Sequence, residues 1–193
     1  MRAAALFSWL LFLDKRGRDM KKNTVKQLVF AAVCLAIGLI LPSVFHTLAI
    51  PGTIFLPMHI PVLLCGLLCG WQLGGFIGVI VPLLCSALTG MPPIFPTGVA
   101  MVFELCAYGL LGGLFYRKLK WNVYLALIGG MVCGRLVSGV ANAVFMGMAD
   151  KAYGLQAFVS GAFVTALPGI AIQIVLIPLI VLALEKSKLS ERP

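Results

Sequence analysis

Six long apolar segments, separated by short connections rich in proline, glycine or charge, limit what this chain can fold into. They cover about residues 25–41, 58–71, 73–88, 97–116, 122–148 and 157–184. A bilayer core about 30 Å thick is crossed by a helix of roughly 20 apolar residues. Six such crossings use nearly all of the 193 residues. The sequence therefore predicts an all-α integral membrane protein with six transmembrane helices.

The low share of charged residues agrees with this class. Charged residues make up 11% of the chain, whereas soluble domains carry about 25%. We expect one six-helix transmembrane domain over residues 20–193, preceded by an N-terminal extension, residues 1–19, to which the sequence assigns no role. This arrangement leaves no space for a nucleotide-binding domain or another soluble module.

The basic residues predict the orientation of the helices. Of the fifteen Lys and Arg residues, seven lie before or at the start of the first apolar segment, three follow the fourth and three lie near the C-terminus. With six crossings, these thirteen fall on one side of the membrane, as the positive-inside rule requires of the cytoplasmic face. We therefore expect both termini in the cytoplasm, and the net charge of +9 does not indicate a nucleic-acid partner.

Cysteines and sequence motifs give no sign of a cofactor or a catalytic centre. All six cysteines lie within apolar segments, and none forms a C-x-x-C pair. This distribution favours packing over a metal site or a disulfide. The Walker, G-x-S-x-G and H-E-x-x-H motifs are also missing from the sequence. We expect a protein without cofactor or metal that is not an enzyme.

Two charged residues, Glu104 and Arg135, fall deep within predicted spans. A charged residue costs about 2.5–3.5 kcal/mol at the centre of a membrane helix on insertion scales, so it usually faces the protein interior or a water-filled cavity. One hypothesis is a structural ion pair that joins two helices. The other is that one or both residues face a ligand cavity.

Polar residues around these two charges favour the cavity. Ser138 and Asn142 follow Arg135 at helical spacing, and on the sixth span Thr165 and Gln173 share a face. His59 begins the second span, where a structural role and a ligand-binding role both remain open. The candidate substrate-binding residues are His59, Glu104, Arg135, Ser138, Asn142, Thr165 and Gln173.

Glycines recur at four-residue spacing in the predicted helices. They are Gly66, Gly70, Gly74 and Gly78, then Gly109 with Gly113, and Gly130 with Gly134. Small residues at this spacing let membrane helices approach closely. We interpret them as packing positions within the chain.

Several of these features together resemble the substrate-binding (S) components of energy-coupling factor (ECF) transporters, the vitamin importers of bacteria and archaea. The first span contains Ala32-x-x-x-Ala36, similar to the alanine motif by which such subunits dock on their coupling protein. The second begins with Leu-Pro-Met-His-Ile-Pro at 56–61. The run Thr-Gly-Met-Pro-Pro-Ile-Phe-Pro-Thr at 89–97, followed by Glu104 and then Arg135, continues the pattern. The resemblance covers roughly residues 24–185.

The resemblance implies a high-affinity capture subunit in the plasma membrane of a prokaryote. It would bind a water-soluble vitamin or precursor from outside, beneath a lid formed by the connection at 43–57. It would then associate, through Ala32 and Ala36, with a transmembrane coupling subunit and two ATPase subunits. Apart from membrane lipid, no other partner is expected.

The substrate and the alternatives stay open at this level. Arg135 offers a donor fork suited to a carboxylate, so pantothenate or another carboxylate-bearing vitamin is a first guess. If Arg135 instead pairs with Glu104, that argument disappears. The main alternative is an intramembrane enzyme acting on a lipid or isoprenoid, with His59 and Glu104 as its candidate groups. A proton- or ion-coupled transporter working alone, or a purely structural subunit, is also compatible with the sequence.

Overall fold

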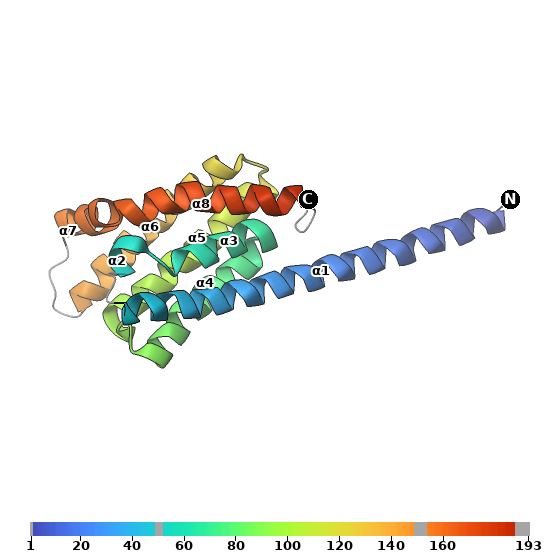
Figure 1. The fold of residues 1–193 in the computed structure, drawn as a ribbon. Coiled ribbons are helices and arrows are strands. Elements are labelled where there is room, and N and C mark those ends of the chain that lie inside the picture. The colour runs from blue at the N-terminus through green and yellow to red at the C-terminus, as the bar shows by residue number, and fades with distance from the viewer. Residues whose placement is uncertain (1, 49–51, 149–153, 188–193) are drawn as a thin grey trace.

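The computed structural model describes residues 2–48, 52–148 and 154–187, with side chains from Thr24 onward apart from those of residues 155, 157 and 162. This part of the chain is helical and contains no strand. The α-helices are α1 (Arg2–Thr47), α2 (Gly52–Phe55), α3 (His59–Cys69), α4 (Trp71–Thr89), α5 (Val99–Gly113), α6 (Val123–Met148), α7 (Leu155–Val159) and α8 (Leu167–Lys186) (Figure 1). Three π-helical turns join them, namely η1 (Ile94–Gly98), η2 (Leu114–Lys118) and η3 (Ser160–Thr165).

Six stretches of the described residues are long and apolar enough to cross a membrane. They are Thr24–Thr47, Gly52–Cys69, Trp71–Thr89, Ile94–Lys118, Val123–Met148 and Leu167–Lys186. The all-α class and the six predicted spans are therefore confirmed. The cytoplasmic placement of the termini stays a prediction from the charge distribution.

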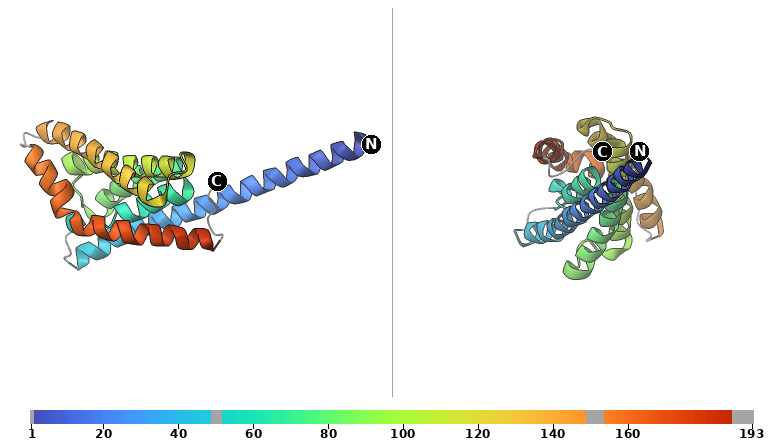
Figure 2. Two further views of the ribbon diagram at one scale, coloured as in Figure 1. Left: turned by 90° about the horizontal axis from the view of Figure 1, so that it is seen from above. Right: turned by 90° about the vertical axis from the view of Figure 1, so that its right-hand side faces the viewer.

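Helix α5 occupies the centre of the bundle and packs against α3, α4 and α6. Helix α1 lies along α3 and α4 on one side, and α8 contacts α2, α3 and α6 on the other. Figure 2 shows that α6 and α8 spread apart toward the end of the bundle where α7 lies. This open end holds the candidate site described below.

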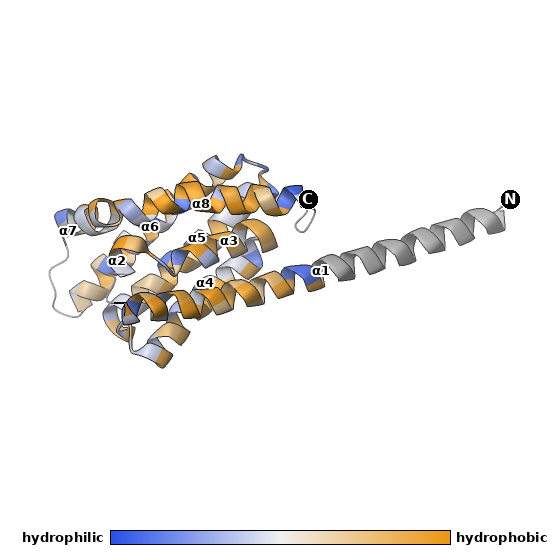
Figure 3. Cartoon of the chain, in the orientation of Figure 1, coloured by the Kyte–Doolittle hydropathy of each residue, from blue (hydrophilic) through white to orange (hydrophobic). Residues whose placement is uncertain are grey.

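The outward faces of the helices are apolar, as contact with lipid requires. Large apolar side chains such as Leu28, Phe76, Val140 and Val175 are more than half exposed. Figure 3 shows hydrophobic residues along the lengths of the spans and hydrophilic ones near their ends. An isolated water-soluble protein rarely exposes so much contiguous apolar surface, so the bilayer is the solvent that these faces fit.

Several of these glycines set the separation of the central helices, in line with their interpretation as packing positions, whereas Gly70 forms the turn between α3 and α4 with φ of 104°. A Cβ built on Gly109 would overlap the carbonyl group of Gly74, and one built on Gly66 would lie 3.2 Å from the Gly109 Cα. Between α5 and α6, a Cβ on Gly130 would lie 3.1 Å from the Gly112 Cα. A methyl group at Gly109 or Gly66 would force a shift of the backbone, and one at Gly130 would be tight, so the backbones approach closely.

The first span does not end at Pro42, as its apolar pattern predicted, but continues to Thr47 with Pro42 inside the helix. Proline cannot donate to the carbonyl four residues earlier, and its ring normally crowds that carbonyl. Here the freed carbonyl oxygen of Gly38 accepts a bond from the Cys85 Sγ of α4, at 3.6 Å. A neighbouring helix thus supplies the partner that proline removes.

The sixth apolar segment and the predicted lid also differ from expectation. The segment at 157–184 divides into α7, η3 and α8, because Pro168 stands at the start of α8 and proline ends a preceding helix. The connection at 43–57 is partly helical: α1 extends into it, and α2 occupies Gly52–Phe55. The predicted boundary between residues 1–19 and 20–193 falls within α1, and this division stays a prediction.

Candidate functional site

A cavity of about 630 Å³ lies at the end of the bundle that the charge distribution predicts to face outside. Its apolar wall consists of Pro42, Phe45, Leu56, Pro57, Met58, Met91, Pro92, Pro93 and Met101. Its polar lining consists of His46, Thr53, His59, Thr89, Thr97, Glu104, Arg135, Asn142 and Thr165, with Gly52 and Gly161 completing the surface. The cavity therefore draws on α1 to α6 and on two π-helical turns.

Proline-rich connections hold two sides of this cavity. Between α2 and α3, Leu56 adopts a left-handed backbone with φ of 52°, a conformation that costs energy for a bulky residue and often marks a functional site. After α4, the Ser86 hydroxyl donates to the Pro92 carbonyl at 2.6 Å. A proline has no N–H to donate, so it cannot hold its own place through a backbone donor. Hydrogen bonds to its carbonyl, such as the one from Ser86, keep this wall of the cavity in position.

Glu104, on α5, is the centre of a buried polar cluster at the cavity. Its Oε1 accepts a hydrogen bond from Arg135 Nη1 at 2.8 Å and lies 3.3 Å from His59 Nε2. Its Oε2 accepts the Ser138 hydroxyl at 2.7 Å. Asn142 Nδ2 donates in turn to Ser138 Oγ at 3.2 Å and to the Ser138 carbonyl at 2.9 Å.

This geometry combines the two hypotheses that the sequence left open. Glu104 and Arg135 form an ion pair between α5 and α6, and both also line the cavity. Both carboxylate oxygens of Glu104 are engaged with protein groups, so Glu104 serves mainly to hold Arg135, His59 and Ser138 in place.

Several buried polar atoms around this cluster have no hydrogen-bond partner within the described part of the chain. They include Arg135 Nε, Arg135 Nη2, His59 Nδ1 and the Tyr108 hydroxyl. Native proteins pair the large majority of such atoms, and exceptions often belong to functional sites. An arrangement of this kind can receive a polar ligand, with guanidinium N–H groups as donors.

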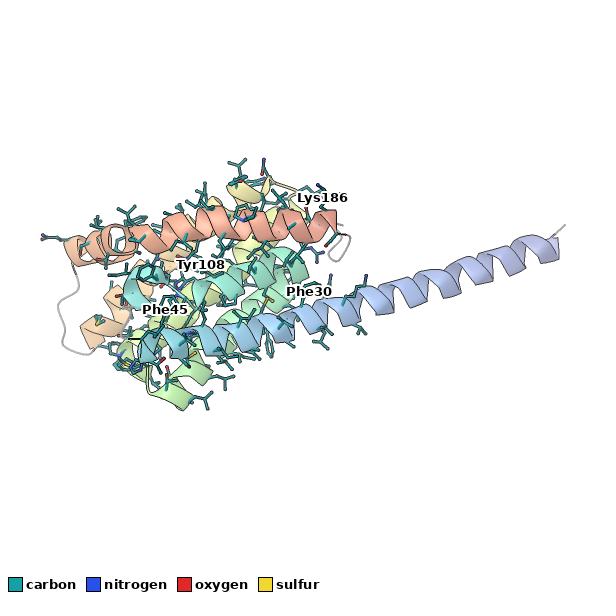
Figure 4. All side chains as sticks on the ribbon, viewed as in Figure 1. Phe30, Phe45, Tyr108 and Lys186 are labelled. Carbon is teal, nitrogen blue, oxygen red and sulfur yellow. The ribbon has the colours of Figure 1, made fainter. Side chains whose placement is uncertain are left out.

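Tyr108 belongs to this cluster although the sequence did not single it out. It is 1% exposed, and its ring meets His59 edge to face at 5.3 Å between centroids; Figure 4 shows it inside the bundle. It lies one helical turn after Glu104, a spacing that could have pointed to it. The threonines of the cavity, Thr53, Thr89 and Thr97, were missed because they lie in or beside irregular connections, where periodicity gives no guidance.

The remaining predicted substrate-binding residues take different positions. Asn142 and Thr165 line the cavity, whereas Ser138 contacts it through Glu104 and Asn142. Gln173 is fully buried in α8, is not among the lining residues, and neither of its amide atoms has a partner in the described structure. Within the described residues, no group of three or more His, Cys, Asp or Glu side chains has the geometry to hold a metal ion.

The predicted docking residues Ala32 and Ala36 lie on α1, away from the cavity. Both are exposed, on the face of α1 opposite the buried Ala31 and Cys34. Helix α1 is also the least buried of the six candidate spans in the described chain. A smooth apolar face is therefore available there.

The chain matches the model of a known protein family. Residues 26–181 match the family described as "ECF transporter, substrate-specific component". A search of curated proteins found no match, and neither did a search of solved structures. The family match covers all six candidate spans except their outermost residues.

Proposed function

The chain belongs to the family of substrate-specific components of ECF transporters, and we propose that it captures a water-soluble vitamin or vitamin precursor in the cavity around Glu104 and Arg135. One observation carries this proposal. Two side chains that line a cavity of about 630 Å³, Arg135 and His59, keep buried polar atoms with no hydrogen-bond partner among the described residues. These atoms have almost no exposed surface in the ligand-free structure, so a ligand that displaces the groups covering them would supply the missing partners.

The cavity has the size and character of a small-molecule site. Such sites usually enclose about 300–1,000 Å³ and combine an apolar lining with a few placed polar groups. Here Met58 and Met101 stand among the apolar walls, and Thr97, Asn142 and Thr165 add polar groups. The apolar body of a vitamin would contact the methionines, while its polar groups would reach Arg135 and the polar groups of the lining.

Family membership supports association with partner proteins that supply energy. We propose that Ala32 and Ala36 form the surface on which a transmembrane coupling subunit docks. Two ATPase subunits would belong to the same complex. Their methyl groups permit close helix contact and need no solvation. The setting would be the plasma membrane of a prokaryote, with the cavity open to the outside and lipid around the remaining helix faces.

The charge of the ligand is a separate question. The sequence favoured a carboxylate, such as that of pantothenate, because Arg135 offers a donor fork. Arg135 retains Nε and Nη2 for such a group, but Glu104 already compensates its charge. Charge alone therefore gives no preference for an anion, and pantothenate stays a prediction.

The alternative of an intramembrane enzyme has less support. It requires an acid–base pair free to act on a lipid, whereas both oxygens of Glu104 already contact His59, Arg135 and Ser138. The chain belongs to a family of transporter components. We propose that it performs no catalysis of its own.

The experiment is ligand capture by the purified chain in detergent, without partners and without ATP. Mass spectrometry of the purified protein should identify a co-purified vitamin or precursor, and calorimetry should then give its affinity. Failure of every member of a broad vitamin panel to bind would contradict the proposal. Arg135→Met, which removes the donor edge, should abolish the binding, whereas the exposed Lys118→Met should leave it unchanged.

A further inference from the structure

The described residues that line the cavity have a formal charge of zero, and this constrains what the site can bind. Among the described residues that line it, Glu104 and Arg135 are the only ones of the types Asp, Glu, Lys and Arg. They lie 2.8 Å apart and are each 8% exposed at the side chain. Each compensates the other, so the site holds no spare charge for a charged ligand.

A charged ligand would therefore enter at a cost. An ion loses its hydration when it is buried, and the loss is offset only by an opposite charge that is not already compensated. A carboxylate placed against Arg135 would also lie close to Glu104, whose like charge would repel it. An uncharged carbonyl or ring nitrogen meets the same guanidinium donors with a much smaller desolvation cost.

The hydrogen bonds of Glu104 also define which polar groups the site presents. A carboxylate paired with Arg135 only accepts hydrogen bonds, so the His59 Nε2 that lies 3.3 Å from it carries the proton. Arg135 already compensates the charge of Glu104, and burial disfavours a second cation beside it, so His59 is neutral in this arrangement and its other nitrogen is an acceptor. The unpartnered Nδ1 of His59 is thus an acceptor, and the unpartnered Nε and Nη2 of Arg135 are donors.

We propose that the site takes a ligand without net charge, whose polar end presents a carbonyl or ring-nitrogen acceptor to Arg135 and an N–H or O–H donor to His59. Cyclic amides and ureas, primary amides and hydroxylated heterocycles have this chemistry. The proposal rests on the proposed capture function and narrows its substrate class. It departs from the carboxylate-bearing vitamin, such as pantothenate, that the sequence favoured. Glu104 is then a positioning residue that holds Arg135, orients His59 and cancels the charge of the site.

The first experiment compares vitamins of different charge on the purified full chain at pH 7. The panel contains uncharged members (nicotinamide, pyridoxine, riboflavin, panthenol), anions (nicotinate, pantothenate, biotin) and the cation thiamine. We expect the tightest ligand to be uncharged and to bind at least about tenfold more tightly than its charged counterpart. A charged tightest ligand would overturn this inference but leave the capture function intact. Binding of no vitamin would overturn both.

The second experiment changes the charge of the site. Glu104→Gln keeps acceptor and donor groups but leaves Arg135 uncompensated. The ratio of the affinity for a carboxylate to the affinity for the matching amide should therefore rise by at least about tenfold. This ratio is measured with nicotinate and nicotinamide, or with the equivalent pair for the tightest ligand. The matched control is Glu185→Gln, at a carboxylate that accepts the Tyr116 hydroxyl at 2.6 Å outside the cavity. An unchanged ratio in Glu104→Gln would overturn the inference even if that variant retains binding. If the variant does not fold, the wild-type comparison still decides.

Discussion

Arg135 Nη1 and Glu104 Oε1 lie 2.8 Å apart although their residues belong to different membrane helices, α6 and α5. The pair joins these helices at the cavity and leaves the second donor edge of Arg135 without a partner among the described residues. One interaction therefore contributes both to the stability of the bundle and to the polarity of the site. The two contributions can be separated by experiment.

Removing one member of the pair should destabilise the protein more than removing both. Arg135→Met leaves the Glu104 carboxylate buried without a counter-charge, and we expect the free energy of unfolding to fall by about 3–5 kcal/mol. The double variant Glu104→Gln with Arg135→Met buries no charge and should recover much of that loss. Thermal unfolding of ligand-free protein in detergent measures both. A double variant as unstable as the single one would show that the pair is not the cause.

Gln173 provides a test of a predicted substrate-binding residue that lies outside the cavity lining. Its buried amide has no partner within the described chain, and an unsatisfied buried polar group costs about 1–3 kcal/mol. Gln173→Leu should therefore raise the unfolding temperature of the ligand-free protein. If Gln173 reaches the substrate in the bound state, the same change should weaken binding at least about tenfold in calorimetry. Unchanged affinity would remove Gln173 from the proposed binding residues.

The exposed alanine face of α1 should be needed for transport but not for capture. Ala32→Trp and Ala36→Trp place a bulky ring where close helix contact is proposed, so uptake by cells that contain the complete transporter should be lost. Binding by the isolated chain should persist, because neither residue lines the cavity.

The control for this test is Ile37→Trp. Ile37 is also exposed on α1, at 43%, but its side chain lies about 100° around the helix from Ala36. We expect this variant to retain uptake. Loss of vitamin binding in Ala32→Trp or Ala36→Trp would contradict the docking role.

Glycine contacts between α4 and α5 should tolerate no side chain. In Gly109→Ala the new methyl group would overlap the Gly74 carbonyl, so we expect a loss of about 1–3 kcal/mol from overpacking. Gly147→Ala, where a Cβ meets nothing within 4 Å, should be neutral or slightly stabilising, because alanine favours helix. Thermal unfolding of the ligand-free protein in detergent compares the two variants. Equal changes in their stability would mean that the close contact at Gly109 does not limit the stability of the bundle.

The sequence determined the membrane class, the six spans and the inventory of polar residues within them. These follow from hydropathy, charge and periodicity, which depend on neighbouring residues along one chain. Glu104 and Arg135 stood out for the same reason, since a charged residue in a span is conspicuous wherever its partner lies. The family resemblance rested on local motifs and is confirmed over residues 26–181.

The tertiary structure decided which of these polar groups meet. Contacts between Glu104, His59 and Ser138 depend on how far α3, α5 and α6 rotate and how closely they approach, and the glycine contacts set that approach. Tyr108 entered the cluster, and α1 continued past Pro42 with the Gly38 carbonyl bonded to Cys85 of α4. No local pattern encodes these relationships, because each joins residues far apart in the chain. Packing in three dimensions therefore placed the polar groups together at one cavity, whose described lining has a net formal charge of zero.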